Sequence, residues 1–450
     1  MDSRHQTWAT SERLVPRRFV RPFVRFTRIE ASSGIVLLVA AIAAVVWANS
    51  AFSDTYFQVL DTHLTIDFGP IHLDESLQHL INDGLMAIFF FVVGLEIKRE
   101  LVAGDLKDPR AAALPVMAAL GGMIVPALVY VALNAGAGGE ALRGWGIPMA
   151  TDIAFAVGVV ALLGTKVPGG AKLFLLALAI ADDIGAIAVI AIFYTDELNV
   201  TYLVMAVAGL AAIWAAQKAG VRALTFYVPL ALLIWFLTLE SGVHATLAGV
   251  ALGFLTPARP MYRPAEFDLR ARAILDEYPV EPEEDPRSQE HADYEALLLS
   301  EIATEAVSPL SRIEHRLQVW SSFLVVPLFA LANAGVDFRD TQITESLTSS
   351  VALGVALGLV VGKIVGITVF TFAAVRLGLG RLPAGTGWPH VIGLAAVAGI
   401  GFTVSLFVAG LAFSDQATID LAKVGIFAGS LVSGVVGAIV LSRTKVPVRR

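Results

Sequence analysis

The sequence predicts an all-α protein that crosses a membrane many times. Of its 450 residues, 56% are hydrophobic and only 16% are charged, and the mean hydropathy is +0.72. A soluble domain carries about a quarter charged residues. Apolar runs of about 20 residues recur from end to end, and each is long enough to span a bilayer as a helix. A transmembrane β-barrel would instead show short segments of alternating hydrophobicity.

Charge and cysteine content exclude several other classes of site. The chain contains no cysteine, which excludes disulfides, thiolate metal sites and cysteine nucleophiles. The net charge is −7, but the segment from Glu266 to Glu305 alone holds 13 acidic residues against 3 arginines. The rest of the chain is therefore slightly basic, and no face for binding nucleic acid is indicated.

Twelve membrane spans are predicted from the apolar runs. Their residue ranges are 33–52, 79–97, 111–134, 144–164, 170–194, 200–217, 221–238, 241–257, 317–336, 349–375, 388–413 and 420–442. These spans divide the chain into five parts: a basic cytoplasmic tail (1–28), transmembrane helices 1–8 (29–257), an acidic cytoplasmic loop (258–314), transmembrane helices 9–12 (315–442) and a cytoplasmic C-terminal tail (443–450).

Loop charges predict the orientation, because cytoplasmic loops are enriched in Lys and Arg. The N-terminal tail has six arginines from Arg13 to Arg28, whereas the next loop, 53–78, has no Lys or Arg. Basic residues then return in every second loop, which predicts an even number of spans with both termini in the cytoplasm. The first apolar run, Gly34–Trp47, ends without a convincing signal-peptidase site, so we interpret it as an uncleaved span.

Two segments interrupt the helical pattern. Residues 62–73 alternate apolar and polar positions around Gly69-Pro70, which predicts an external β-hairpin, with an irregular loop as the alternative. The loop 258–314 contains "PVEPEEDPRSQE", which lacks the apolar content to pack a core. We expect a tolerated, partly disordered insertion with one short surface helix at "YEALLLSEIATEAV"; a regulatory or partner-binding role is the alternative.

Ionisable side chains fall near the middle of two spans. Asp182 and Asp183 are adjacent at the centre of span five, and Lys363 lies just past the middle of span ten. On insertion scales, each charge at such a depth costs roughly 2.5–3.5 kcal/mol, so these residues are expected to be functional. Because adjacent helical residues point about 100° apart, one aspartate can meet Lys363 while the other faces a water-filled funnel.

Two spans are predicted to be discontinuous, spans four and eleven. Pro148 interrupts span four, and Thr151-Asp152 has the pattern of an N-cap for a second half-helix, where an anion suits the positive helix end. Gly399 and Gly401 fall at the midpoint of span eleven and can release its helix. Spans 3–5 and 10–12 then form two halves of an inverted repeat, each with its broken helix in the middle.

Broken helices with carboxylates and an ammonium at one depth are typical of the ion site of a secondary transporter. Burial favours the protonated form of a carboxyl group, which can exchange its proton for a hard cation such as sodium. Taken singly, Thr151-Asp152 is explained equally well as a helix cap, and a mid-span aspartate as a structural ion pair. Together on neighbouring spans, these residues favour cation–proton exchange.

At these residues the chain resembles the NhaA-type sodium/proton antiporter family. Matching stretches cover nearly the whole membrane portion in order, and include "GWGIPMATDIAFAVGVVALLG", "ALAIADDIGAIAVIAIFYT", "SGVHATLAGV", "GKIVGI" and "GIGFTVSLFVAGLAF". The resemblance implies twelve helices, crossed helices four and eleven, and electrogenic exchange of protons for Na+ and Li+ without a cofactor. It also implies the inner membrane of a bacterial cell and a homodimer formed through the hairpin.

The resemblance also implies roles for individual residues. Asp183 and Asp182 would bind sodium and protons, Lys363 would be the partner of Asp182, and Thr151 and Asp152 would lie at the helix crossing. The residues expected outside this site are Asp83 for the outward proton path, and Glu96, Arg99, Glu100, Glu314, His315 and His244 for the pH response. Where the family pattern often has a second histidine this chain has Gln318, and its acidic loop is longer than usual, so the pH set-point does not carry over.

Three other functions can be compared with the same sequence features. An intramembrane aspartyl protease also places aspartates on two spans, but it uses a Gly-x-Gly-Asp context that is absent here, and it has no use for a lysine beside the pair. A passive cation channel needs a continuous filter and no proton-binding groups. Antiport of another cation, such as K+, would use the same kinds of residue.

Overall fold

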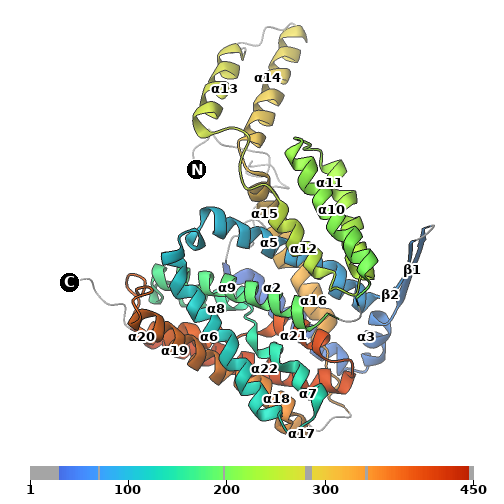
Figure 1. Ribbon diagram of the computed structural model, residues 1–450, viewed down its shortest axis with the longest axis vertical. Coiled ribbons are helices and arrows are strands. Elements are labelled where there is room, and N and C mark those ends of the chain that lie inside the picture. Colours follow the sequence, from blue (N-terminus) through green and yellow to red (C-terminus); the bar gives the residue numbers. More distant parts are fainter. Residues whose placement is uncertain (1–29, 69–70, 196–197, 279–285, 340–342, 445–450) are drawn as a thin grey trace.

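The computed structural model describes residues 30–68, 71–195, 198–278, 286–339 and 343–444, which form a bundle of helices and one two-stranded hairpin (Figure 1). The N-terminal tail, most of the C-terminal tail and the Gly69-Pro70 turn lie outside these residues. Within them, eight helical stretches are long and apolar enough to cross a membrane, or ten if each bent pair counts as one span. Two shorter apolar helices, at 225–240 and 246–255, coincide with the other two predicted spans.

The elements follow one another in three groups. The first comprises α2 (Glu30–Ala48), α3 (Ser53–Leu60), β1 (His63–Phe68), β2 (Ile71–Ser76), α4 (Leu77–Leu80), the π-helical turn η4 (Ile81–Leu85), α5 (Met86–Ala103), η5 (Asp105–Lys107), α6 (Pro109–Asn134), α7 (Gly139–Leu142), the 3-10 stretch η6 (Arg143–Met149), α8 (Ile153–Leu163), η7 (Gly164–Lys166) and α9 (Gly169–Phe193). The second comprises α10 (Val200–Lys218), α11 (Leu224–Glu240), α12 (Thr246–Leu255), α13 (Pro264–Glu277) and α14 (Pro286–Glu305). The third comprises α15 (Pro309–Trp320), the π-helical turn η8 (Ser321–Val325), α16 (Val326–Asn333), α17 (Ile343–Thr348), α18 (Ser350–Leu357), the π-helical turn η9 (Gly358–Gly362), α19 (Lys363–Arg376), α20 (Trp388–Val397), α21 (Phe402–Ala412) and α22 (Gln416–Arg443).

The first predicted span ends earlier than expected. The apolar run extends to residue 52, but α2 stops before Asn49, whose side chain donates to the carbonyl oxygens of Val45 and Val336 at 2.8 and 2.7 Å. An asparagine that satisfies its own helix end in this way favours termination. Helix α3 then leaves at 114° to α2. The hairpin is confirmed: β1 pairs antiparallel with β2, and His63 lies opposite Ser76.

Two long helices cross at a pair of glycines in the core. A methyl group on Gly121 of α6 would overlap the carbonyl oxygen of Gly366 on α19, and a methyl group on Gly366 would overlap that of Gly121. Only glycine permits such a close approach of two backbones. Beside them the second half of α20 is enclosed, because Leu394 to Ala398 are all 0% exposed. Non-helical backbone at this depth is tolerated only inside protein or beside a cavity.

The acidic loop holds one helix more than predicted. The predicted short helix lies largely within α14, whereas α13 was not predicted, and both helices stand away from the helical body (Figure 1). The polar residues 279–285 lie outside the described residues. Ion pairs one turn apart stabilise α13, at Arg270–Glu266 and Arg272–Asp268. Isolated helices need little apolar content when such pairs and a proline at the first position are present, so hydropathy alone missed α13.

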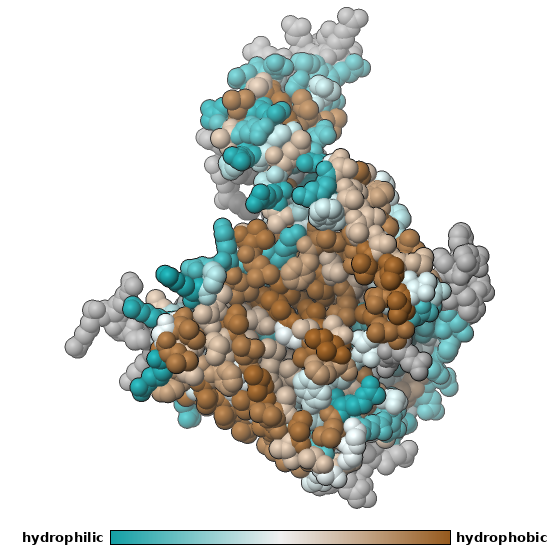
Figure 2. Space-filling model, viewed as in Figure 1, coloured by the Kyte–Doolittle hydropathy of each residue, from teal (hydrophilic) through white to brown (hydrophobic). Residues whose placement is uncertain are grey.

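The surface of the helical body is largely hydrophobic, whereas hydrophilic side chains gather on α13 and α14 (Figure 2). On the outer faces of the body, Leu162, Ile192 and Leu431 are 74, 71 and 70% exposed. Exposed apolar surface of this extent marks a membrane interface. The structure is therefore that of a polytopic helical membrane protein.

Candidate functional site

Two helix ends meet where the backbones of the broken spans cross. The amide of Asp152 donates to the carbonyl oxygen of Ile400 at 2.6 Å, which joins the start of α8 to the non-helical residues 398–401 between α20 and α21. The break therefore contains Gly399 and Gly401, and the helices on either side of it are bent by 50°. In span four the half before the break is the 3-10 stretch η6 and not an α-helix, because Pro148 lies within it.

A single carboxylate caps both half-helices. Asp152 is 2% exposed; its Oδ1 accepts from the amide of Phe155 in α8 at 3.1 Å. Its Oδ2 accepts from the amide and the hydroxyl of Thr403 in α21, at 3.1 and 2.5 Å. Both helix N-termini carry a partial positive charge, so one buried anion between them stabilises both. Asp152 thus uses its oxygens to hold the crossing together.

Beside the crossing lies a buried ion pair. The ammonium of Lys363 donates to Asp182 Oδ2 at 2.6 Å and to the hydroxyl of Thr151 at 2.9 Å. The hydroxyl of Thr151 lies 2.7 Å from Asp182 Oδ2 and 2.8 Å from the carbonyl oxygen of Ala398. It has one proton and can therefore donate to only one of them at a time. Lys363, Thr151 and Asp182 are 0, 0 and 1% exposed, which makes this group part of the core.

One oxygen of Asp182 and the whole carboxylate of Asp183 have no partner in the described residues. Asp182 Oδ1 is buried and accepts no hydrogen bond, although Oδ2 accepts at least one. Asp183 is 7% exposed and takes part in no hydrogen bond or ion pair within the described part of the chain. An unpaired carboxylate at this depth is costly, so it is stable only with a proton or a cation bound to it. The adjacent aspartates thus differ: Asp182 is paired with Lys363, and Asp183 is unpaired in the described residues.

The sequence did not single out three hydroxyl groups that complete the crossing. Thr403 binds Asp152, and Ser405 donates to the carbonyl oxygen of Ile147 at 2.8 Å. Ser430 of α22 accepts from the amides of Gly401 and Phe402, both at 3.3 Å, and so caps the start of α21. The only signal for the first two is their position just after the glycines in "GIGFTVS". Nothing in the sequence around Ser430 connects it to a residue so far away.

The other predicted site residues fall in separate groups. Asp83 lies in the π-helical turn η4, and its Oδ2 is 2.8 Å from His79 Nε2. Arg99 of α5 donates to Glu314 of α15 at 2.5 Å, with Glu100 3.5 Å away. Two more residues predicted for the pH response lie on the same helices: Glu96 on α5, and His315, which is exposed on α15. We call Glu96, Arg99, Glu100, Glu314 and His315 the Arg99 group.

The structure does not bring His244 to the Arg99 group. Its Nε2 lies 2.5 Å from the carbonyl oxygen of Tyr194, at the end of α9. Arg99 is near the other end of α9, because its neighbour Ile97 belongs to a buried cluster with Ala177. From Ala177 to Tyr194 the chain rises by roughly 25 Å along α9, so His244 lies apart from that group.

Comparisons with known proteins agree with one another. The model of a family described as "Na+/H+ antiporter 1" matches residues 24–441. A Na(+)/H(+) antiporter NhaA from Rhodopirellula baltica is 47% identical over 420 residues, which cover 93% of both chains. Proteins of the same name from Syntrophobacter fumaroxidans and Anaeromyxobacter sp. are 46 and 48% identical over 429 residues; these cover 93 and 94% of this chain, and 90 and 92% of those relatives.

Proposed function

Since the chain belongs to the Na+/H+ antiporter 1 family and is a Na+/H+ antiporter, not an enzyme, we propose that Asp182 and Asp183 exchange sodium ions for protons. The unequal pairing of these adjacent carboxylates supports the proposal. Asp182 meets Lys363 at 2.6 Å, whereas Asp183 has neither hydrogen bond nor ion pair in the described residues. Each aspartate can therefore have its own role in the cycle.

Asp183 is the residue on which sodium and a proton compete. Without a partner, its carboxylate is neutralised by a bound proton, because an isolated charge is unfavourable at this depth. A sodium ion supplies the same neutralisation and prefers oxygen ligands. Asp182 Oδ1, which is unpartnered and buried, is the second oxygen available to the ion. Because one site holds either cation, sodium binding should weaken as the pH falls.

The Lys363–Asp182 pair accounts for electrogenic exchange. One sodium ion exchanged for one proton moves no net charge. If sodium draws Asp182 away from Lys363, the unpaired ammonium is left in an apolar surrounding and releases a second proton. Each net charge that then crosses contributes about 2.3 kcal/mol per 100 mV. More protons than sodium ions therefore move in each cycle.

Asp152 and Thr151 hold the crossing in place for this exchange. Asp152 neutralises the positive ends of α8 and α21. Lys363 donates to the hydroxyl of Thr151, which lies 2.8 Å from the carbonyl oxygen of Ala398 at the negative end of α20. We assign Asp83 to the outward proton path and the Arg99 group, together with His244, to the pH response.

The architecture that we propose has twelve spans arranged as inverted repeats. The packing supports it: α6 lies on α9 as α18 lies on α22, and α6 crosses α19 at the two facing glycines. Helices α11 and α12 complete the count of spans. Both termini and the α13–α14 segment would lie in the cytoplasm of a bacterial cell, with the hairpin outside.

Sodium-driven proton flux in proteoliposomes tests this function directly. We expect flux with Na+ and Li+ and none with K+, measured with a pH-sensitive dye at several pH values. Equal proton flux with K+ would contradict selectivity for sodium and would indicate a less selective cation–proton exchange. Ion movement without any coupled proton movement would indicate a channel.

Shortening the hairpin is expected to weaken a homodimer without stopping transport. Replacing Leu64–Glu75 by two glycines removes the paired strands but keeps Ser76, whose hydroxyl accepts from the amide of His79 at 3.1 Å and caps α4. The monomer fraction in detergent, measured by light scattering, should rise while proton flux persists. An unchanged dimer fraction would show that other surfaces hold the copies together.

Removal of α13 and α14 should leave exchange intact. Replacing Pro264–Thr304 by a Gly/Ser linker keeps Glu305, which pairs with Arg222 at 3.2 Å, and Ser308, which caps α15. None of the crossing residues contacts the described residues of this segment, so maximal flux should stay within about twofold of the unmodified protein. Lost flux in a folded, inserted variant would contradict this prediction, and a shifted pH profile alone would indicate a regulatory role.

A further inference from the structure

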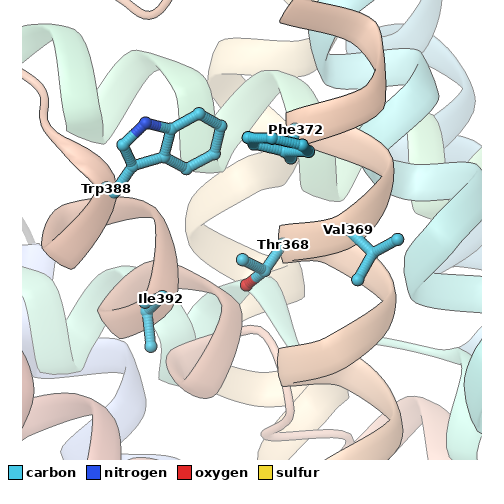
Figure 3. Close-up of a pocket in the computed structure, with 5 residues that line it drawn as sticks. All are labelled: Thr368, Val369, Phe372, Trp388 and Ile392. Atoms are coloured by element: carbon cyan, nitrogen blue, oxygen red, sulfur yellow. The ribbon is translucent and has the colours of Figure 1, made fainter. Parts of the chain in front are cut away.

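A groove between α19 and α20 lies outside the ion site. It has a volume of about 340 Å³, and it is lined by Thr368, Val369 and Phe372 of α19 and by Trp388 and Ile392 of α20 (Figure 3). The rings of Phe372 and Trp388 face each other across one end, with centroids 5.5 Å apart. Four of the five lining side chains are apolar or aromatic, so the groove suits a hydrocarbon chain better than a polar solute.

The groove opens onto the outer face of the bundle. Val369, Phe372 and Ile392 are 52, 46 and 38% exposed, and one and two turns before Val369, Val365 and Val361 are 43 and 46% exposed. These residues form one exposed apolar stripe along η9 and α19. On a membrane-spanning element such a stripe faces lipid. An acyl chain can therefore reach the groove from the bilayer.

The aromatic end of the groove carries an unpaired positive charge. The guanidinium carbon of Arg376, the last residue of α19, lies 5.1 Å from the centroid of the Phe372 ring. Arg376 has no carboxylate partner in the described residues, and the sequence contains no Asp or Glu from Ser350 to Ser414. Tryptophan beside arginine at the end of a span is typical of the headgroup region of a membrane.

Two further arginines lie at the same end. Arg381 is in the connection between α19 and α20, and Arg443 ends α22. Leu441 packs against Gly393, so α22 runs antiparallel to α20 and finishes beside its first turn. The groove thus leads from an apolar slot, past two aromatic rings, to Arg376.

We propose that this groove binds one anionic phospholipid, with an acyl chain between α19 and α20 and its phosphate at Arg376. The apolar slot and the cation are arranged in the order in which a lipid presents its chain and its headgroup. A zwitterionic lipid fits the slot equally well but gains less from the arginines, so headgroup charge decides occupancy. The bound lipid contacts both the helix that carries Lys363 and the first half of the broken span.

Trp388 itself can report on this lipid. A variant that keeps only Trp388, with the other six tryptophans replaced by phenylalanine, is reconstituted into phosphatidylcholine vesicles after its sodium-driven proton flux is verified. Increasing fractions of phosphatidylglycerol or phosphatidylcholine with brominated chains are included. Quenching of Trp388 fluorescence by the anionic lipid should reach half its maximum at an about fivefold lower mole fraction, as expected when one arginine faces a headgroup with a net negative charge and not a neutral one.

Trp214 provides the matched control. It is 54% exposed on α10, and Lys218 in the last turn of that helix lies 5.7 Å from its ring, but it does not line the groove between α19 and α20. A variant that keeps only Trp214 should show a clearly smaller preference for the anionic lipid. In the Trp388 variant, Arg376→Gln should remove the preference, and Ile392→Phe, which fills the slot, should reduce quenching by both lipids.

Equal half-maximal fractions for the two brominated lipids at Trp388, with Arg376 intact, would overturn the proposal. So would a preference that Arg376→Gln leaves unchanged. Weak quenching by both lipids that rises when the protein is diluted in the vesicles would also overturn it, because a second copy of the chain would then cover the groove.

Discussion

Asp183→Asn is expected to abolish sodium-driven proton exchange while leaving the fold intact. The substitution removes a carboxylate that makes no hydrogen bond or ion pair in the described residues, so no structural contact is lost with it. It also removes the group that would bind either sodium or a proton, because an amide cannot be ionised. Flux in everted vesicles should fall at least about a hundredfold, a difference of about 2.7 kcal/mol or more.

A second substitution distinguishes this role of Asp183 from a general effect of neutralising a buried carboxylate. Asp83→Asn changes a carboxylate of similar burial on another span, which is paired with His79 at 2.8 Å. It should slow exchange without removing sodium binding. If Asp183→Asn retained exchange at a comparable rate, Asp183 would not be the residue that carries the ion.

Asp182→Asn is expected to impair both stability and exchange. Lys363 is 0% exposed, and its ammonium would lose its only carboxylate partner in the described residues. Breaking a buried ion pair by removing one partner costs roughly 3–5 kcal/mol, because an uncompensated charge remains. The thermal midpoint in detergent should therefore fall together with the rate of flux.

The double variant Asp182→Asn with Lys363→Gln should recover part of the thermal stability and part of the exchange rate. Removing the second charge eliminates the unpaired ammonium, and a buried amide pair costs much less than a lone charge. Any exchange that returns should move fewer charges per cycle and depend less on voltage. A double variant that is less stable than Asp182→Asn alone would show that the pair does not act as a unit.

The sequence alone predicts that one of the two adjacent aspartates meets Lys363, and the resemblance to the antiporter family assigns Asp182 to it; the structure shows this pair at 2.6 Å. The sequence predicts Asp152 as a helix cap, and the structure agrees. It does not predict that the same carboxylate also binds Thr403, since nothing local connects residues 251 positions apart. Contacts of this kind depend on how the broken spans cross, which is a property of the whole bundle.

Local irregularities of the helices are also invisible to hydropathy. The π-helical turn η9 ends directly before Lys363, and η4 contains Asp83. Such turns are frequent at functional sites. They change the backbone register by one residue without changing the composition of the apolar run, so the sequence predicts continuous spans there. Helix α13 was missed because it is too polar to form an apolar run, although ion pairs one turn apart favour a helix there.

Calorimetry of sodium binding at several pH values tests the central claim most directly. If sodium and a proton compete for Asp183, the apparent affinity of the unmodified protein should fall with decreasing pH, by up to about tenfold per pH unit for each proton displaced. Asp183→Asn should show no sodium binding at any pH. Sodium binding by Asp183→Asn with the pH dependence of the unmodified protein would contradict the assignment of this carboxylate.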